Sequence, residues 1–129
     1  MQVTAVRSSF QTADGCSIAY TLREASLLGT ANEPSRIALV HSLALDRDIW
    51  DGVAERLADR ASVLAYDTRG HGRSSRVPGP FTMEQFAQDL AQLMDHVGWP
   101  FAVVAGCSMG GCVAQAFGGL YPELSLIHI

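Results

Sequence analysis

The sequence Val103-Val104-Ala105-Gly106-Cys107-Ser108-Met109-Gly110-Gly111 contains the pattern Gly-x-Ser-x-Gly at the end of an apolar run. The residues that follow, 112–117, are typical of a helix. In this arrangement the serine lies in a sharp turn between a strand and a helix. Such a turn exposes the serine hydroxyl as a nucleophile. Glycine is needed at 106 and 110, because side chains there would collide with the crossing strand and helix. The pattern therefore predicts that Ser108 is a nucleophile.

Two more short, largely apolar runs lie upstream, at residues 37–40 and 62–66. Runs of this kind are typical of strands that are covered on both faces. A helical pattern that begins at Asp48 lies between them, and a second begins with a capping box at Thr82. With the strand at 101–105, the order is strand, helix, strand, helix, strand and helix.

The first part of the chain follows a different pattern. Residues 3–10 and 16–22 both alternate, and Asp14-Gly15 between them marks a tight turn, which predicts an antiparallel hairpin. Residues 23–35 are polar and predict a surface loop. The fold class is therefore α/β: a mostly parallel sheet with an initial antiparallel hairpin and helices on both faces.

Each of the first two predicted helices has one apolar face. On the first helix this face consists of Ile49, Trp50, Val53 and Leu57, and on the second of Phe86, Leu90, Leu93 and Val97. Gly98 and Pro100 then end the second helix. Because parallel strands end at one edge of a sheet, the loops that start at His41, Asp67 and Gly106 should converge.

Composition limits the function classes. The chain has 129 residues, the size of one small domain, and its net charge of −4 argues against nucleic-acid or anionic membrane surfaces. No apolar run approaches the length of a membrane span, and the start has no signal-peptide core. Three cysteines without a Cys-x-x-Cys pattern indicate neither a disulfide framework nor a zinc site. We therefore expect a cytoplasmic protein without a metal or cofactor.

These motifs resemble those of the α/β-hydrolase superfamily over most of the chain. The resemblance rests on His-x-Leu at 41–43, Tyr-Asp-Thr-Arg-Gly-His-Gly at 66–72 and Cys-Ser-Met-Gly-Gly at 107–111. Within the superfamily it is strongest to 3-oxoadipate enol-lactonases, which open a small lactone in bacterial aromatic catabolism. Two positions depart from the usual patterns: Ser42 stands where most of the superfamily has glycine, and Ala44 stands where the lactonase loop usually has glycine.

The resemblance implies an acyl-transfer site around Ser108. An oxyanion hole needs two N–H donors, and we expect them from the backbone of Met109, at the helix N-terminus, and of Leu43. Losing one such donor typically costs about 3 kcal/mol of transition-state stabilisation. We assign Ser42 and Trp50 to substrate binding, although Trp50 is also suited to the core.

The other polar residues of these loops have structural interpretations. His41 and His71 are expected to hold loop shape rather than to act as bases, and His96 suits the last turn of a helix. Asp67, Arg69 and Arg73 could form an anion site, but a network that fixes the loop is the simpler interpretation. Cys107 is interpreted as a small filler beside the serine.

The acid and base of a triad follow the serine in this superfamily. Only about twenty residues follow Ser108, and His128 is the only histidine among them. We interpret residues 1–123 as the N-terminal portion of a single α/β-hydrolase domain and 124–129 as a non-native tail. The strand at 101–105 would then be an exposed edge, and we expect the chain as printed to be inactive and poorly soluble.

The predicted function is a serine hydrolase that acts on a carboxylic ester or lactone through an acyl-enzyme. Carbon–carbon bond hydrolases and cofactor-free perhydrolases share the motifs and remain alternatives. A non-catalytic fragment of the same fold is the competing class. The expected partner is a small-molecule ester or lactone, without nucleic acid or membrane, and the oligomeric state stays open.

Overall fold

The computed structural model describes residues 5–25 and 35–128. The strands are β1 (Ala5–Gln11), β2 (Ser17–Arg23), β3 (Ser35–Val40), β4 (Ala61–Tyr66), β5 (Ala102–Gly106) and β6 (Ser125–His128). The helices are a 3-10 turn (Arg47–Trp50), α1 (Asp51–Arg56), α2 (Met83–Val97) and α3 (Met109–Leu120). Most of the predicted loop at 23–35 lies outside the described residues, as do residues 3, 4 and 129 of the predicted hairpin and tail.

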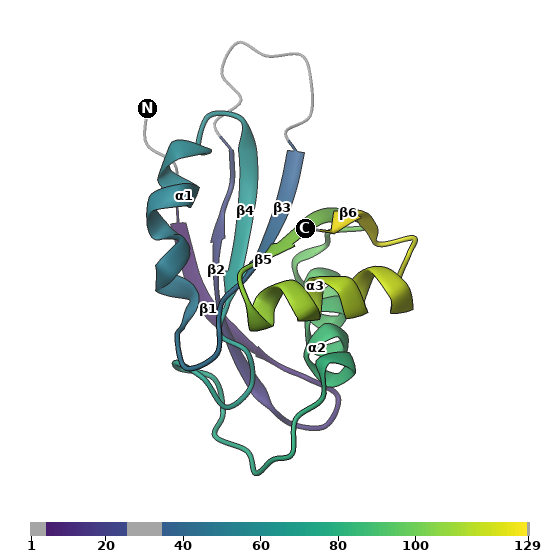
Figure 1. Cartoon of the computed structure of the whole chain (residues 1–129). Helices are drawn as coiled ribbons and strands as arrows, with labels where there is room; N and C mark the ends of the chain where they lie inside the picture. The colour runs from purple at the N-terminus through teal and green to yellow at the C-terminus, as the bar shows by residue number, and fades with distance from the viewer. Residues whose placement is uncertain (1–4, 26–34, 129) are drawn as a thin grey trace.

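The strands form one sheet in the order β1-β2-β4-β3-β5-β6. β1 pairs antiparallel with β2, and β2 pairs antiparallel with β4. The remaining pairs, β4 with β3, β3 with β5 and β5 with β6, are parallel (Figure 1). The predicted fold class, a mostly parallel sheet that starts with an antiparallel hairpin, is confirmed.

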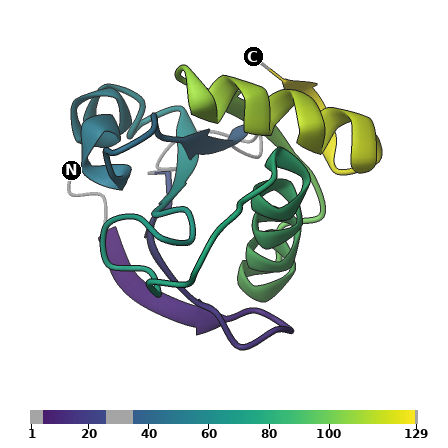
Figure 2. The ribbon, with the colours of Figure 1, turned by 60° about the horizontal axis from the view of Figure 1, so that its bottom comes forward.

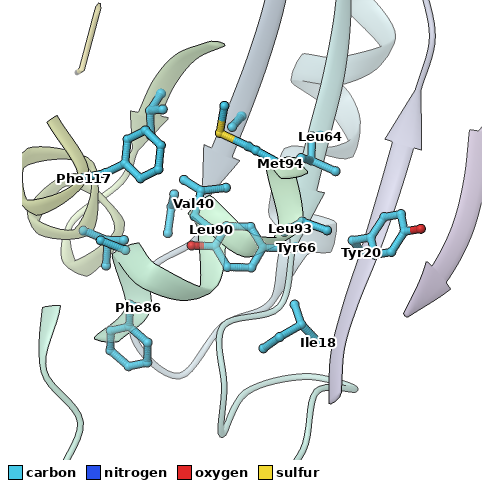
Figure 3. Close-up of a cluster of buried hydrophobic side chains, with 14 of the residues drawn as sticks. Ile18, Tyr20, Val40, Leu64, Tyr66, Phe86, Leu90, Leu93, Met94 and Phe117 are labelled. Atoms are coloured by element: carbon cyan, nitrogen blue, oxygen red, sulfur yellow. The ribbon is translucent and has the colours of Figure 1, made fainter. Parts of the chain in front are cut away.

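Helices cover the two faces of the sheet unequally. α2 and α3 lie on one face and the short α1 lies on the other (Figures 1 and 2). Successive residues of the strands alternate between the faces, so Val40 packs toward α2 and α3 while Leu39 packs toward α1. The larger core lies on the side of α2 and α3 (Figure 3). Its fully buried side chains include Ile18, Leu64, Tyr66, Phe86, Leu90, Leu93 and Phe117.

The start and end of α2 agree with the sequence. The backbone N–H of Gln85 donates to Thr82 Oγ1 at 3.0 Å, which satisfies one of the free donors at the helix start. The ring centroids of Phe81 and Phe86 lie 5.6 Å apart, as in a hydrophobic staple. Gly98 ends the helix in the left-handed conformation.

The helix predicted from Asp48 is different in the structure. Asp46, not Asp48, is the cap: its carboxylate accepts from the N–H of Asp48 at 2.9 Å and starts a 3-10 turn. The α-helix follows only at Asp51 and is six residues long. Two members of the predicted apolar face, Ile49 and Val53, are 39% and 41% exposed. A helix this short covers little of the sheet, so these two side chains stay partly exposed.

The expectation that the strand at 101–105 would be an edge is wrong. The chain turns after α3, where the N–H of Leu124 donates to Tyr121 O at 2.9 Å. β6 then runs parallel to β5, with Ala102 opposite Ser125 and Val104 opposite His128. Within the described residues, β6 is therefore the outer strand on this side. The non-native origin of residues 124–129 stays a prediction.

Candidate active site

The carboxyl ends of three parallel strands meet at one edge of the sheet. Val40, the last residue of β3, is opposite Tyr66 of β4 on one side and Gly106 of β5 on the other. The loops that begin at His41, Asp67 and Cys107 therefore start next to one another. Side chains and backbone groups of these loops can act together on one bound molecule.

Ser108 lies in the sharp turn between β5 and α3. Its backbone has φ 57° and ψ −115°, a conformation that is strained for a residue with a Cβ, and its side chain is exposed. A Cβ on Gly106 would lie 2.0 Å from Gly110 O, and one on Gly110 would lie 2.0 Å from Val40 O. The strand, the turn and the helix thus approach too closely for side chains at these two positions.

The predicted oxyanion donors border this turn. Met109 is the first residue of α3, and among the described residues neither its N–H nor that of Leu43 donates to an acceptor. The Ser42 hydroxyl donates to the carbonyl oxygen of Cys107 at 3.2 Å. This bond ties the loop that carries Leu43 to the residue before Ser108, so the two N–H groups belong to connected segments.

His41 is fully buried and both of its ring nitrogens are bonded. Nδ1–H donates to Ser42 O at 2.8 Å, and Nε2 accepts from the N–H of Thr68 at 3.0 Å. Burial lowers the pKa of His41, which keeps the ring neutral. These contacts give His41 the structural role expected from the sequence, because no free nitrogen is left to take a proton from Ser108.

Thr68 links the two histidines of the neighbouring loops. Its Oγ1 lies 3.3 Å from His41 Nε2 and 2.9 Å from His71 Nδ1. The rings of His41 and His71 have centroids 5.2 Å apart. His96 is elsewhere, on α2, where its ring stacks on Phe10 at 5.1 Å. The sequence analysis assigned no role to Thr68, and its membership of the motif at 66–72 was the only signal for it.

Asp67 fixes the loop after β4 through a partner that the sequence did not indicate. Its carboxylate accepts from Arg47, through the backbone N–H at 2.7 Å and through Nη1 at 2.5 Å. A third bond comes from the N–H of Arg73 at 3.1 Å. A Cβ on Gly72 would collide with this carboxylate. The ion pair of Arg47 and Asp67 is almost completely buried.

Arg69 belongs to a second buried network. Its guanidinium donates through Nε and Nη2 to Asp89 of α2, both at 2.7 Å, and through Nη1 to Asp14 at 2.9 Å. The hydrogen bond from Arg69 holds the pKa of the Asp14 carboxyl well below its usual range. Burial raises the pKa of Asp89. The loop is held by ion pairs as expected, but in two separate networks: Asp67 bonds to Arg47 and to the N–H of Arg73, and Arg69 bonds to Asp14 and Asp89. The sequence signal that could have identified Asp89 was its place as a charged residue on the apolar side of α2.

A model of the family described as the alpha/beta hydrolase fold matches residues 36–127. The match includes all three loops and the turn at Ser108. The chain belongs to the α/β-hydrolase fold family.

Individual relatives agree with this assignment. 3-Oxoadipate enol-lactonase 2 of Acinetobacter baylyi is 37% identical over 95 residues, which are 74% of this chain and 35% of that protein. A hydrolase from Pseudomonas aeruginosa PA01 superposes with a TM-score of 0.83 at 34% identity, covering 92% of this chain and 43% of that one. The enol-lactonase from Burkholderia xenovorans LB400 gives a TM-score of 0.81 at 30% identity, covering 92% and 44%. The resemblance to enol-lactonases is confirmed, and the chain spans less than half of each relative's length.

In this α/β-hydrolase chain, Trp50 and Ser42 lie in different surroundings. Trp50 packs against the small apolar cluster beneath α1, and its Nε1 is enclosed without an acceptor among the described residues. Ser42 lies in the loop beside the nucleophile turn, with its hydroxyl bonded to Cys107 O. Substrate binding by either residue stays a prediction.

A hollow of about 490 Å³ opens beside Leu43. Leu43, Ala44, Leu45 and Asp46 line it on one side, and Gly70, His71, Gly72 and Arg76 on the other. Ala44 has φ 64°, so the glycine usual in enol-lactonases at this position would adopt the same backbone without strain. Within residues 5–25 and 35–128, no group of three or more His, Cys, Asp or Glu side chains could hold a metal ion. In the same ranges, no helix has the length and apolar character needed to cross a bilayer.

Proposed function

We propose that this chain is the nucleophile-bearing part of a serine hydrolase that opens a carboxylic ester or lactone. The observation that carries the proposal is the conformation of Ser108. This residue is exposed and its backbone is strained, and the turn around it is held by close backbone contacts at Gly106 and Gly110. A chain gives up folding free energy for such a turn when the turn presents a reactive side chain. The similarity to enol-lactonases supports a lactone as the substrate.

In the proposed reaction, Ser108 Oγ attacks the carbonyl carbon of the substrate and its proton passes to a base. The carbonyl oxygen becomes an oxyanion, which the N–H groups of Met109 and Leu43 stabilise. Collapse of this intermediate breaks the carbonyl–oxygen bond and leaves the acyl group on Ser108. Water then adds to the acyl-enzyme and releases the acid, which restores the serine hydroxyl.

The base and the acid of the triad are proposed to lie in the part of the whole protein that corresponds to the rest of the relatives' length. Both nitrogens of His41 are engaged, and His71 Nδ1 is bonded within its own loop. His41 therefore has no free nitrogen with which to deprotonate Ser108. We propose that residues 1–123 are the native portion of the domain and that the chain as printed does not turn over.

A serine-directed fluorophosphonate probe tests the proposal. The uninterrupted reading frame should be recovered from its genomic locus, and the whole protein labelled beside its Ser108→Ala and Cys107→Ala variants. We expect labelling of the whole protein and of Cys107→Ala, and none of Ser108→Ala. Equal labelling of Ser108→Ala would refute the role of Ser108, and labelling lost in Cys107→Ala alone would make Cys107 the nucleophile.

Substrate assays on the same whole protein separate the alternatives. We expect hydrolysis of 3-oxoadipate enol-lactone, a step of aromatic catabolism, at a higher kcat/KM than that of simple aryl esters. Faster hydrolysis of a carbon–carbon bond would contradict the lactonase assignment. A faster perhydrolase reaction, measured as oxidation that depends on added peroxide, would contradict it as well. No turnover and no probe labelling would indicate a non-catalytic member of the family.

We also propose that the protein acts in the cytoplasm. Cys16, Cys107 and Cys112 are all free thiols in the structure, and Cys107 and Cys112 are exposed. Exposed thiols of this kind persist most easily in a reducing compartment. Fractionation of the native host, followed by immunodetection, tests this assignment.

A further inference from the structure

A second hollow, of about 330 Å³, lies on the side of the hairpin β1–β2 that faces α1. Its lining consists of Arg7, Ser8, Ser9, Ser17, Ala19, Arg47 and Arg73. The loop after β4, which carries Arg73, runs beside β1 (Figure 2). None of these residues belongs to the turn at Ser108 or lines the hollow beside Leu43.

The hollow exists because this face of the hairpin carries small side chains. In the antiparallel register Ser9 is opposite Ala19, and residues opposite one another share a face. Phe10 and Ile18 point to the other face, where they are buried in the core. Small side chains on one face, with guanidinium groups around them, leave an open space instead of a packed surface.

The Arg47 guanidinium is held rigidly at the wall of this space. Nε donates to Thr21 Oγ1 at 2.9 Å and Nη1 donates to Asp67 Oδ2 at 2.5 Å. The side chain is 5% exposed. Among the described residues the guanidinium donates through Nε and Nη1, which leaves Nη2 available. A fixed guanidinium with a spare N–H next to a cavity is a preformed donor for an anion.

The other two arginines add charge that the protein does not neutralise tightly. The Arg73 side chain has no carboxylate within ion-pair distance in the described part of the chain, although its backbone N–H bonds to Asp67. Arg7 meets Asp48 only at 3.9 Å, with both side chains about half exposed. The hollow is therefore locally positive in a chain whose net charge is −4.

We propose that this hollow binds a small phosphate-class oxyanion, either inorganic phosphate or the phosphate end of a phosphomonoester. Arg47 and Arg73 would bind its oxygens through N–H donors, and the hydroxyls of Ser9 and Ser17 would donate further hydrogen bonds. No carboxylate lines the hollow among the described residues. The proposal is independent of the hydrolase function.

An occupant of this site would link β1 to the loops that shape the candidate active site. Arg47 follows the loop that carries Leu43, and its partner Asp67 begins the loop that carries His71. A ligand that binds the folded chain and not the unfolded chain raises the free energy of unfolding. Bound phosphate should therefore stabilise the fold.

The experiment uses the complete chain fused to a soluble carrier protein, with the carrier alone as a blank. Thermal unfolding is followed in inorganic phosphate, methyl phosphate, acetate and chloride at equal ionic strength, and phosphate binding is titrated by calorimetry. The variant is Arg73→Gln. The matched control is Arg60→Gln, whose side chain is 78% exposed and pairs with the exposed Asp59 at 3.6 Å.

We expect phosphate and methyl phosphate to raise the unfolding temperature more than chloride or acetate. Arg73→Gln should weaken phosphate binding at least tenfold, and Arg60→Gln should leave it unchanged. Equal responses to chloride and phosphate, or unchanged binding in Arg73→Gln, would overturn the proposal. Tighter binding of acetate than of phosphate would overturn the ligand class. Absence of both a phosphate-dependent transition and calorimetric binding would overturn the site itself.

Discussion

The carbonyl oxygen of Val40 lies 2.0 Å from the position that a Cβ on Gly110 would occupy. The end of β3 and the first turn of α3 are therefore in direct backbone contact. The N–H of Cys107 also donates to this carbonyl, at 3.2 Å. A single peptide group of β3 thus positions both sides of the turn that carries Ser108.

Substitution Gly110→Ala should destabilise the fold by about 3 kcal/mol or more, because the added methyl group meets backbone atoms that cannot rotate away. Gly119→Ala is the matched control in the same helix. A Cβ there meets nothing within 4 Å, so alanine should stabilise the helix by about 1 kcal/mol. Urea unfolding followed by circular dichroism measures both changes. Equal midpoints for the two variants would contradict the close contact.

Substitution Arg69→Gln should lower the free energy of unfolding by about 3–5 kcal/mol, because it leaves Asp89 buried without a charge partner. The two side chains are only 6% and 2% exposed. Arg60→Gln, which removes an exposed ion pair with Asp59, should have no measurable effect. Chemical denaturation at neutral pH compares the variants. Asp89→Asn combined with Arg69→Gln should cost less than the sum of the two single changes, since neither charge is then left alone.

Burial of His41 should make stability fall as the solution is acidified. Its pKa in the folded chain is depressed, so below about pH 6.5 the unfolded chain takes up a proton that the folded chain refuses. The contribution of His41 is complete above that pH and is lost below it, with a slope of at most about 1.4 kcal/mol per pH unit. Urea midpoints between pH 8 and pH 5 measure the slope. The variant His41→Gln should flatten it, and an unchanged slope in that variant would assign the effect to other groups.

Expressed as printed, the chain should self-associate through β6. This strand is the outer one in the described sheet, and Leu126 on it is 59% exposed. Unpaired backbone groups beside an exposed apolar side chain promote pairing with other chains. Leu126→Lys should shift the chain toward monomer in sedimentation velocity, whereas Ile49→Lys, an exposed apolar position away from the edge, should not. A soluble monomer with a sharp thermal transition would show that β6 is an adequate edge.

Local sequence predicted the parts of the fold that local chemistry determines. The turn at Ser108 was predictable because its close backbone contacts require glycine at 106 and 110. The start of α2 was predictable because Thr82 caps it directly. The start of the preceding helix was not, because Asp46 and Asp48 are both suitable caps and their order depends on how the loop is held. Arg47 holds that loop through Asp67, a partner twenty residues away.

Pairings between distant segments could not be deduced from the sequence. β6 pairs with β5 because the turn after α3 returns the chain to the sheet. The residues at 125–128 contain no pattern that predicts their partner strand. Asp89 was visible as a charge on the apolar side of α2, but its partner Arg69 lies on a loop after β4. The hollow between Arg47 and Arg73 is lined by β1, β2 and the two segments that carry these arginines, and it has no sequence motif.

The left-handed backbone at Ser108 sets a cost in folding free energy against the proposed catalytic role of its hydroxyl. Glycine adopts φ 57° without a Cβ penalty, whereas serine gives up about 1–3 kcal/mol there. Random substitution under selection for folding alone would drift toward glycine at this position. Ser108→Gly should therefore raise the free energy of unfolding while it removes the hydroxyl of the proposed nucleophile.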